Sequence, residues 1–291
     1  MGKFSLGRRR FCVGLGMGVW AVESWAQCES PARLRFSLVP QGDAGRDLAA
    51  YKPLLAAIEA RLGKPVELLL PQSYGAVVEG LVAGTIDFAI LGPAAYLKAS
   101  KANPDIQVFA SYAKRAGPLQ EEGPYYRAVL AVPAARPYRD VQALQGSVLA
   151  LTDPGSTSGA VLPRRVFPGL TGQSLDSFFG RVVYVGDHDR AGLAVAAGKV
   201  DAAFLSGFHL SELIRQGRIG ADAVRVLWRS EPLPLDAIVY RGRLCASLRK
   251  GIQASFLAQG GRAYPALLEQ QGALGFVPME DEAYRILREM S

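Results

Sequence analysis

Short runs of aliphatic and β-branched residues alternate along this chain with stretches in which apolar residues recur every three or four positions. Residues 34–39 are a run of the first kind, and Leu54, Leu55, Ile58 and Leu62 show the second pattern before Gly63. This alternation predicts α/β layering with mostly parallel sheets. We expect strands at residues 34–39, 66–70, 85–91, 106–112, 126–132, 148–151, 182–185, 200–205, 224–227 and 237–240. We expect helices at residues 51–62, 74–83, 93–99, 141–144, 156–167, 191–197, 211–216, 246–258, 264–270 and 282–290.

The alternation restarts after Pro133 and is broken again by Pro232 and Pro234. Because each half has its own strands and helices, we predict two lobes, the second inserted into the first. The first lobe is expected at residues 33–132 plus 235–291 and the second at residues 133–234. The chain would then cross twice between the lobes, and the two crossings would form a hinge.

Residues 1–26 have the pattern of an export signal. A basic cluster at residues 8–10 precedes the apolar residues 11–22, a stretch too short to span a bilayer stably. Small side chains at Ser24 and Ala26 predict cleavage after Ala26 and a periplasmic location. The arginines followed by Phe11 resemble a twin-arginine signal, and the general secretory route is the alternative.

Composition narrows the classes of function. The chain is 49% hydrophobic and 20% charged, as in globular proteins, and has no uncharged apolar run of about 20 residues, which excludes a polytopic membrane protein. The formal charge is +7, of which +3 lies in residues 1–26, and the other basic residues are scattered. We therefore expect no binding of nucleic acid.

The chain has only three cysteines and two histidines. We therefore expect no metal site and no cofactor. After cleavage only Cys28 and Cys245 remain, and the sequence leaves open whether they form a disulfide. Lipidation of Cys28 is a weaker alternative, because Gln27 stands where a small residue normally precedes a lipidated cysteine.

The segment that carries most chemical information follows the predicted strand 148–151. Asp153-Pro154-Gly155 forms a turn, and Ser156, Thr157 and Ser158 then occupy the N-cap and the first helical positions. The first N–H groups of a helix lack intrahelical acceptors, and the helix dipole is positive there, so such an end binds oxyanions. N-capping explains one hydroxyl but not three. The three together predict a cradle for a tetrahedral anion of the phosphate type.

These residues resemble the substrate-binding proteins of phosphate, phosphite and phosphonate ABC transporters. The resemblance extends over nearly all of residues 33–277. Besides residues 153–159 it rests on Tyr74-Gly75, Gly186-Asp187-His188, Val200-Asp201-Ala202-Ala203 and Pro234-Leu235-Asp236. It implies a two-lobed periplasmic binding protein of type II, with a mostly parallel sheet flanked by helices in each lobe and a two-crossing hinge.

The resemblance also implies a ligand site. Its expected members are Ser156, Thr157 and Ser158 around the anion, Tyr74 and Tyr126 closing over it, and His188 and Asp236 lining it. Each position has a plainer alternative. Tyr74 is then a packing or capping aromatic, Tyr126 a strand residue with Tyr125 as the contact, His188 a solvated loop histidine and Asp236 a turn residue.

Two positions depart from the family pattern. Phe208 stands where members that bind an amine-bearing ligand have an acidic side chain. This favours a small oxyanion such as phosphite, phosphate or methylphosphonate over an aminoalkyl phosphonate. Arg127, beside Tyr126, has no explanation at the level of sequence.

The function that these observations predict is that of a monomeric, non-enzymatic solute receptor that delivers a small phosphorus oxyanion to an inner-membrane ABC permease. A ligand-binding subunit of a membrane sensor is the first alternative. The second is an exported hydrolase with Ser156 or Ser158 as nucleophile and His188 as base, oriented by Asp187 or Asp236. The chain has no Gly-x-Ser-x-Gly elbow to support the hydrolase.

Overall fold

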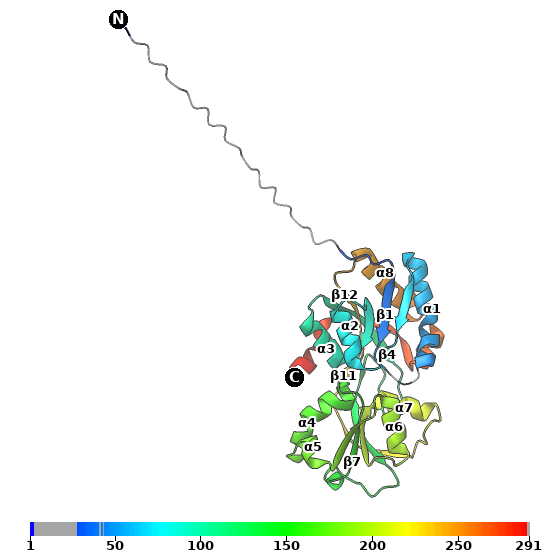
Figure 1. The fold of residues 1–291 in the computed structure, drawn as a ribbon. Helices are drawn as coiled ribbons and strands as arrows, with labels where there is room; N and C mark the ends of the chain where they lie inside the picture. The colour runs from blue at the N-terminus through cyan, green and yellow to red at the C-terminus, as the bar shows by residue number, and fades with distance from the viewer. Residues whose placement is uncertain (3–27, 41, 43, 290–291) are drawn as a thin grey trace.

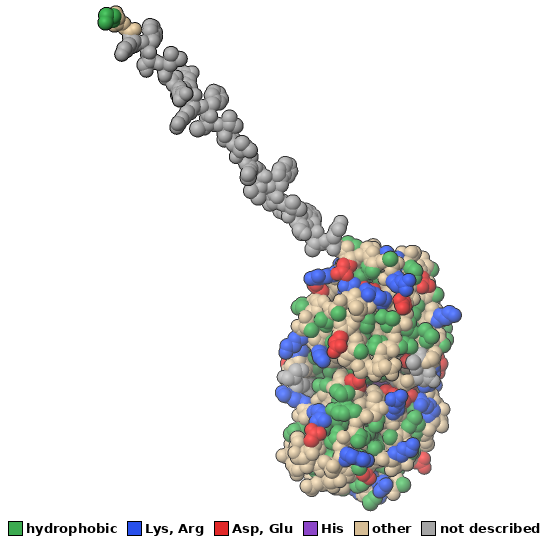
Figure 2. All heavy atoms as spheres, viewed as in Figure 1, with side chains coloured by type: hydrophobic (Ala, Val, Ile, Leu, Met, Phe, Trp, Pro, Cys, Tyr) green, Lys and Arg blue, Asp and Glu red, His purple; other side chains and the backbone are tan. Residues whose placement is uncertain are grey.

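The computed structural model describes residues 1–2, 28–40, 42 and 44–289, and the elements from Leu34 onwards form two α/β lobes (Figure 1). Residues 3–26 of the predicted export signal and its cleavage site lie outside the described residues. In the described ranges no helix is both long and apolar enough to cross a membrane. On the face shown in Figure 2, basic and acidic side chains are interspersed over both lobes and do not gather into one basic stripe.

The first lobe is built on a six-stranded sheet with helices on both faces. Its strands lie in the order β13 (Ala273–Pro278), β4 (Ile106–Lys114), β12 (Ala237–Arg241), β3 (Phe88–Leu91), β1 (Leu34–Leu38) and β2 (Val66–Leu69). Its helices are α1 (Ala44–Leu62), α2 (Tyr74–Val82), α3 (Pro93–Ala102), α8 (Ala246–Phe256), α9 (Ala258–Gly261), α10 (Pro265–Gln270) and α11 (Arg285–Glu289). Along β3, Phe88 and Ile90 enter one apolar cluster and Ala89 and Leu91 the other. Both faces of this strand are therefore buried, as its uninterrupted apolar run indicates.

The second lobe repeats this arrangement around a five-stranded sheet. Its strands lie in the order β10 (Val224–Arg229), β6 (Ala128–Pro133), β9 (Ala202–Ser206), β7 (Val148–Leu151) and β8 (Arg181–Tyr184). Its helices are α4 (Leu162–Thr171), α5 (Leu175–Phe178), α6 (His188–Ala196) and α7 (Gly207–Arg215). Alternate residues of β9 again enter opposite clusters, with Phe204 in one and Leu205 in the other.

The sheets are mixed, so the prediction of mostly parallel sheets is wrong in this detail. β1 is parallel to β2 and β3, and β7 is parallel to β8 and β9. In contrast, β12 is antiparallel to β3 and β4, β13 to β4, and β6 to β9 and β10. The physical reason is chain direction. β1, β3 and β7 run towards the junction of the lobes, whereas β6 and β12 enter their sheets directly from the crossings and run away from it.

The two crossings pair with each other. β5 (Tyr125–Tyr126) and β11 (Leu233–Pro234) form an antiparallel two-stranded ribbon, which we call the crossing ribbon. The expected boundary at residues 132–133 lies too late in the chain, because β6 pairs with β9 and β10 and so belongs to the second sheet. The chain leaves the first lobe at residues 125–127 instead.

Arg127 has its explanation here. Its Nη1 donates to the carbonyl oxygen of Ser230 at 2.8 Å, and its Nε and Nη2 contact Glu121 Oε1 at 3.1 and 3.0 Å. The backbone N–H of Ala128 donates to Ser230 Oγ at 3.0 Å. Arg127 therefore ties the segment that leaves the first lobe to the segment that returns to it.

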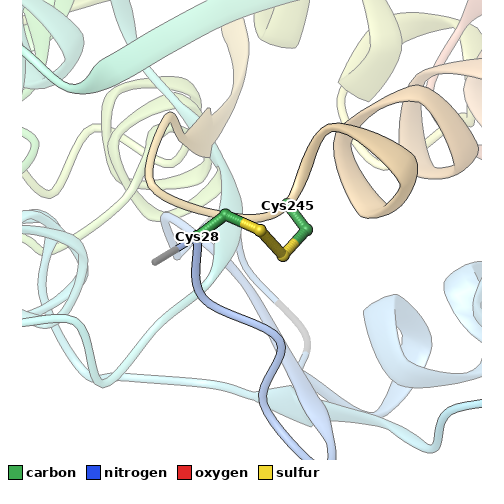
Figure 3. Close-up of a disulfide and its surroundings, with 2 residues drawn as sticks. All are labelled: Cys28 and Cys245. Carbon is green, nitrogen blue, oxygen red and sulfur yellow. A yellow bond between two sulfur atoms is a disulfide. The ribbon is translucent and has the colours of Figure 1, made fainter. Parts of the chain in front are cut away.

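A disulfide joins Cys28 to Cys245, with 4.8 Å between their Cα atoms (Figure 3). Cys245 is the N-cap residue of α8, so the bridge fixes the segment around Cys28 to the first lobe. Backbone hydrogen bonds from Glu29 to Arg243 and from Cys245 to Glu29 accompany the bridge. A sulfur in a disulfide has no thiol left for a lipid, so this bridge is incompatible with lipidation of Cys28.

Candidate functional site

A small cavity lies between the lobes beside the crossing ribbon. The volume open to the centre of a water molecule is about 20 Å³, which suits an ion of a few heavy atoms. It is lined by Tyr74, Gly92, Pro93, Lys114, Tyr126, Ser156, Thr157, His188, Ser206, Phe208, His209, Leu235 and Asp236. Four helices begin at this cavity, because Tyr74, Pro93 and His188 are the first residues of α2, α3 and α6 and Ser206 is the N-cap residue of α7. Their positive ends converge on the cavity and favour an anion there.

The turn after β7 has the predicted position but a different helical form. Residues Thr157–Val161 form a π-helical turn, and α4 begins only at Leu162. This turn packs closely against Thr152, and only glycine fits at position 159, since a Cβ there would lie 1.8 Å from Thr152 Oγ1. Asp153 holds the turn, as its Oδ1 accepts from Gly155 N at 2.7 Å. Its Oδ2 accepts from Tyr74 N in the other lobe at 3.3 Å.

Ser156 and His188 form one hydrogen-bonded unit. His188 Nδ1 accepts from the backbone N–H of Ser206 at 3.1 Å, which leaves the ring proton on Nε2. That proton is donated to Ser156 Oγ at 3.1 Å, and Gly159 N also donates to this oxygen at 3.2 Å. Burial and the neighbouring His209 lower the pKa of His188 well below 6.5, so the ring is neutral. With its lone pairs engaged, Ser156 Oγ has its own proton left to donate into the cavity.

This arrangement contradicts the hydrolase alternative. A general base must accept the serine proton, but the nitrogen of His188 that faces Ser156 already has a proton. The nitrogen that an orienting acid would hold is bonded to Ser206 N instead. Asp187 is engaged elsewhere, because it caps α6 and pairs with Arg190 Nε at 3.3 Å.

The other two hydroxyls of the predicted cradle differ from each other. Thr157 lines the cavity, and its Oγ1 accepts from Ala94 N of α3, in the other lobe, at 2.9 Å. Ser158 is 1% exposed, and its hydroxyl acts on the phenol of Tyr126, which lines the cavity. Two of the three hydroxyls therefore line the cavity, and the third lies beside a phenol that lines it.

The remaining predicted residues come together from the first lobe and the crossing ribbon. A Cβ at Gly92 would lie 3.4 Å from Tyr74 Cε1, 3.9 Å from Thr157 Oγ1 and 4.0 Å from Asp236 Oδ1, so these groups surround one point. Tyr126 lines the same cavity. Burial raises the pKa of both tyrosines, and the charge of Asp236 raises each further, so both phenols remain protonated donors. The structure thus brings the predicted residues together at one cavity, with Ser158 beside the phenol of Tyr126.

Sequence reasoning missed Lys114 and His209, which also line the cavity. Lys114 ends β4, and its Nζ donates to the carbonyl oxygen of Gln271 at 2.7 Å. The ring of His209 stacks on His188 with 4.6 Å between centroids, and burial lowers its pKa to about 3. The sequence held one indication of Lys114, because it lies two positions after Tyr112 and therefore on the same inward face of an apolar strand.

Comparison with known proteins identifies the family and several relatives of this chain. The model of a family described as ABC transporter, phosphonate, periplasmic substrate-binding protein matches residues 36–284. The phosphonates-binding periplasmic protein of Escherichia coli is 28% identical over 259 residues, which are 87% of this chain and 74% of that protein. The phosphate-import protein PhnD of Mycolicibacterium smegmatis is 26% identical over 208 residues, 69% of this chain. The match spans just under two thirds of that relative's length, 64%.

Two solved structures show the same fold. PhnD1 of Prochlorococcus marinus in complex with methylphosphonate superposes with a TM-score of 0.77 at 17% identity, over 90% of this chain and 97% of that one. A binding protein component of an ABC phosphonate transporter of Pseudomonas aeruginosa gives a TM-score of 0.77 at 20% identity, over 90% and 86%. These likenesses extend across both lobes.

Proposed function

Because the chain belongs to the family of periplasmic substrate-binding proteins of phosphonate ABC transporters, we propose that it captures a small phosphorus oxyanion for an importer. Phosphite, phosphate and methylphosphonate are the candidate ligands. The protein acts in the periplasm as a monomer after removal of residues 1–26, and an inner-membrane ABC permease receives the ligand. It binds and releases its ligand without chemical change.

The observation that carries the proposal is the convergence of hydrogen-bond donors on one small cavity. The Ser156 hydroxyl and the Tyr74 and Tyr126 phenols are protonated, and four helix N-termini meet them. A hydrogen bond to a charged group is worth about 1.5–3 kcal/mol, so a few of them suffice for tight binding. Asp236 is an acceptor in this set, and a phosphorus oxyanion that keeps one proton can donate to it.

Capture requires that both lobes contact the ligand at once. Ser156 and His188 belong to the second lobe, Tyr74 to the first and Tyr126 to the crossing ribbon. We expect the lobes to open and close as rigid bodies about the ribbon, as in hinge closure. Small-angle scattering should then show a smaller radius of gyration with ligand than without it. Superimposable curves, with calorimetry confirming binding, would contradict the two-lobe clamp.

A binding screen tests the ligand class. The protein is unfolded in urea without reductant, dialysed to remove residual ligand, refolded with its disulfide intact, and heated with phosphate, phosphite, hypophosphite, methylphosphonate or sulfate. A ligand at 100 times its Kd should add about 2.7 kcal/mol of apparent stability. Titration calorimetry then gives the affinity of each ligand that stabilises the protein. If no phosphorus oxyanion does so, the proposed ligand class is wrong.

The importer and the sensor alternative use the same cavity and differ only in the membrane partner. Deletion of the gene should abolish uptake of the identified ligand supplied as sole phosphorus source. Normal uptake combined with a lost transcriptional response would identify the sensor instead.

A further inference from the structure

Lys114 is the one lysine or arginine among the described residues that line the cavity. It is 2% exposed, so its ammonium group is held inside the protein. Nζ donates to Gln271 O at 2.7 Å and lies 3.8 Å from the ring centroid of Phe208 and 4.4 Å from that of Tyr112. A carbonyl oxygen and two ring faces are the surroundings that stabilise a buried cation.

The turn beside Lys114 contains Gly272, which allows Phe208 and Glu212 to pack closely against it. Gly272 has a φ of +54°, which favours glycine, and a Cβ there would lie 2.6 Å from Glu212 Oε1 and 2.9 Å from Phe208 Cε2. Only glycine therefore lets Phe208 and Glu212 approach the turn. Phe208 is held against Lys114 as a result, and the position of the ammonium group is a built feature of the cavity.

We propose that Lys114 sets the ligand class of the cavity: its ammonium group attracts a small phosphorus oxyanion and excludes ligands that have an ammonium group of their own. This inference rests on the proposed function and adds a selecting residue to it. A cationic ligand would meet a like charge in a cavity too small for water to screen it. The carboxylates on this side, Asp236 and Glu212, already act on Lys114.

The protonation of Lys114 gives this selection a pH dependence. Burial lowers the pKa of Lys114 to about 7, whereas Asp236 and Glu212 raise it and Arg115 lowers it. The other groups that face it are neutral, since burial lowers the pKa of His209 to about 3 and raises that of Tyr112. A bound anion favours the charged ammonium, so binding above pH 7 takes up a proton. Affinity for the anion should therefore fall as the pH rises through 7.

The test compares two ligands of equal size. Ethylphosphonate and aminomethylphosphonate have the same number of heavy atoms and differ by a CH₃ group against an ammonium group. Each is titrated against the protein by calorimetry, alone and in competition with methylphosphonate, at pH 7. Wild type should bind ethylphosphonate at least about tenfold more tightly. In Lys114→Met, which keeps the length of the side chain without its charge, this ratio should fall to within about threefold, and methylphosphonate should bind at least about tenfold more weakly.

The control is Lys199→Met, which removes one exposed positive charge from the second lobe and should change neither affinity. Calorimetry at pH 8 in two buffers of different ionisation enthalpy should show less proton uptake in Lys114→Met than in wild type, while the titration of the ligand itself is common to both. An unchanged ratio in folded Lys114→Met overturns the inference.

The titrations of wild type alone also test the inference. If aminomethylphosphonate binds as tightly as ethylphosphonate, Lys114 does not select against a cation, and if neither competes, size sets the preference. Both results overturn the inference while methylphosphonate binding leaves the proposed function intact. Failure of wild type to bind methylphosphonate, phosphite and phosphate counts against the proposed function itself.

Discussion

Ser156→Ala separates the two roles that one hydroxyl has in this structure. Ser156 Oγ caps the turn by accepting from Gly159 N and also accepts from His188 Nε2. Loss of an N-cap costs about 1 kcal/mol, and an unsatisfied buried donor on His188 costs about 1–3 kcal/mol. We therefore expect the free energy of unfolding to fall by about 2–4 kcal/mol. Loss of a hydrogen bond to a charged ligand should weaken binding about ten- to a hundredfold.

Ser174→Ala is the matched control, because Ser174 caps α5 in the same lobe by accepting from Ser177 N at 3.2 Å. It is exposed and does not line the cavity. Its loss should lower the free energy of unfolding by about 1 kcal/mol and leave affinity unchanged. Urea unfolding and calorimetry, with methylphosphonate or whichever phosphorus oxyanion the screen identifies, measure both quantities on both variants.

The result that would refute this reasoning is specific. If Ser156→Ala loses stability but binds the ligand like Ser174→Ala, the hydroxyl only caps the turn and holds His188. The anion would then be bound by the backbone amides and the tyrosines alone.

Three further outcomes are expected. Asp236→Asn should weaken the phosphorus ligand, admit sulfate or both, since sulfate has no proton to donate to a carboxylate; an unchanged ratio in parallel titrations would make Asp236 a hinge residue. Replacing Cys28 and Cys245 by serine should lower the free energy of unfolding by about 2–5 kcal/mol in urea melts and leave affinity unchanged. The free energy of unfolding should fall as the pH drops below 6.5, because the unfolded chain protonates His188 and His209, whose pKa values are lower in the folded protein. Each histidine should contribute about 1.4 kcal/mol per pH unit to this fall, so His209→Phe should halve the slope of stability against pH.

The elements that the sequence predicted well have a strong local pattern. β7 and α2 begin at their expected residues, because a short apolar run between turns and an apolar stripe from a capped start are both local signals. β13 was missed because Gly275 and the exposed Leu274 interrupt its pattern, and its place depends on pairing with the distant β4. Strand direction was also mispredicted, since it depends on where the chain enters each sheet.

Most of the site was predictable from one motif and the family resemblance. Lys114 and His209 were not, because their importance comes from neighbours far away in the sequence. Gln271 lies beside the ammonium of Lys114, and His188 lies beside His209. A regular helix was expected from residue 156, whereas residues Thr157–Val161 form a π-helical turn and α4 begins at Leu162.

The pairing of β5 with β11 limits how the molecule can move. Two hydrogen-bonded strands cannot slide past each other without breaking their bonds, and Arg127 adds a further link to Ser230. We therefore expect the lobes to rotate about the crossing ribbon rather than slide along it, so that ligand binding changes the angle between them. The angle between the lobes at the protein surface then depends on whether the cavity holds a ligand. A second protein that touches both lobes at once can sense occupancy without contacting a single atom of the ligand.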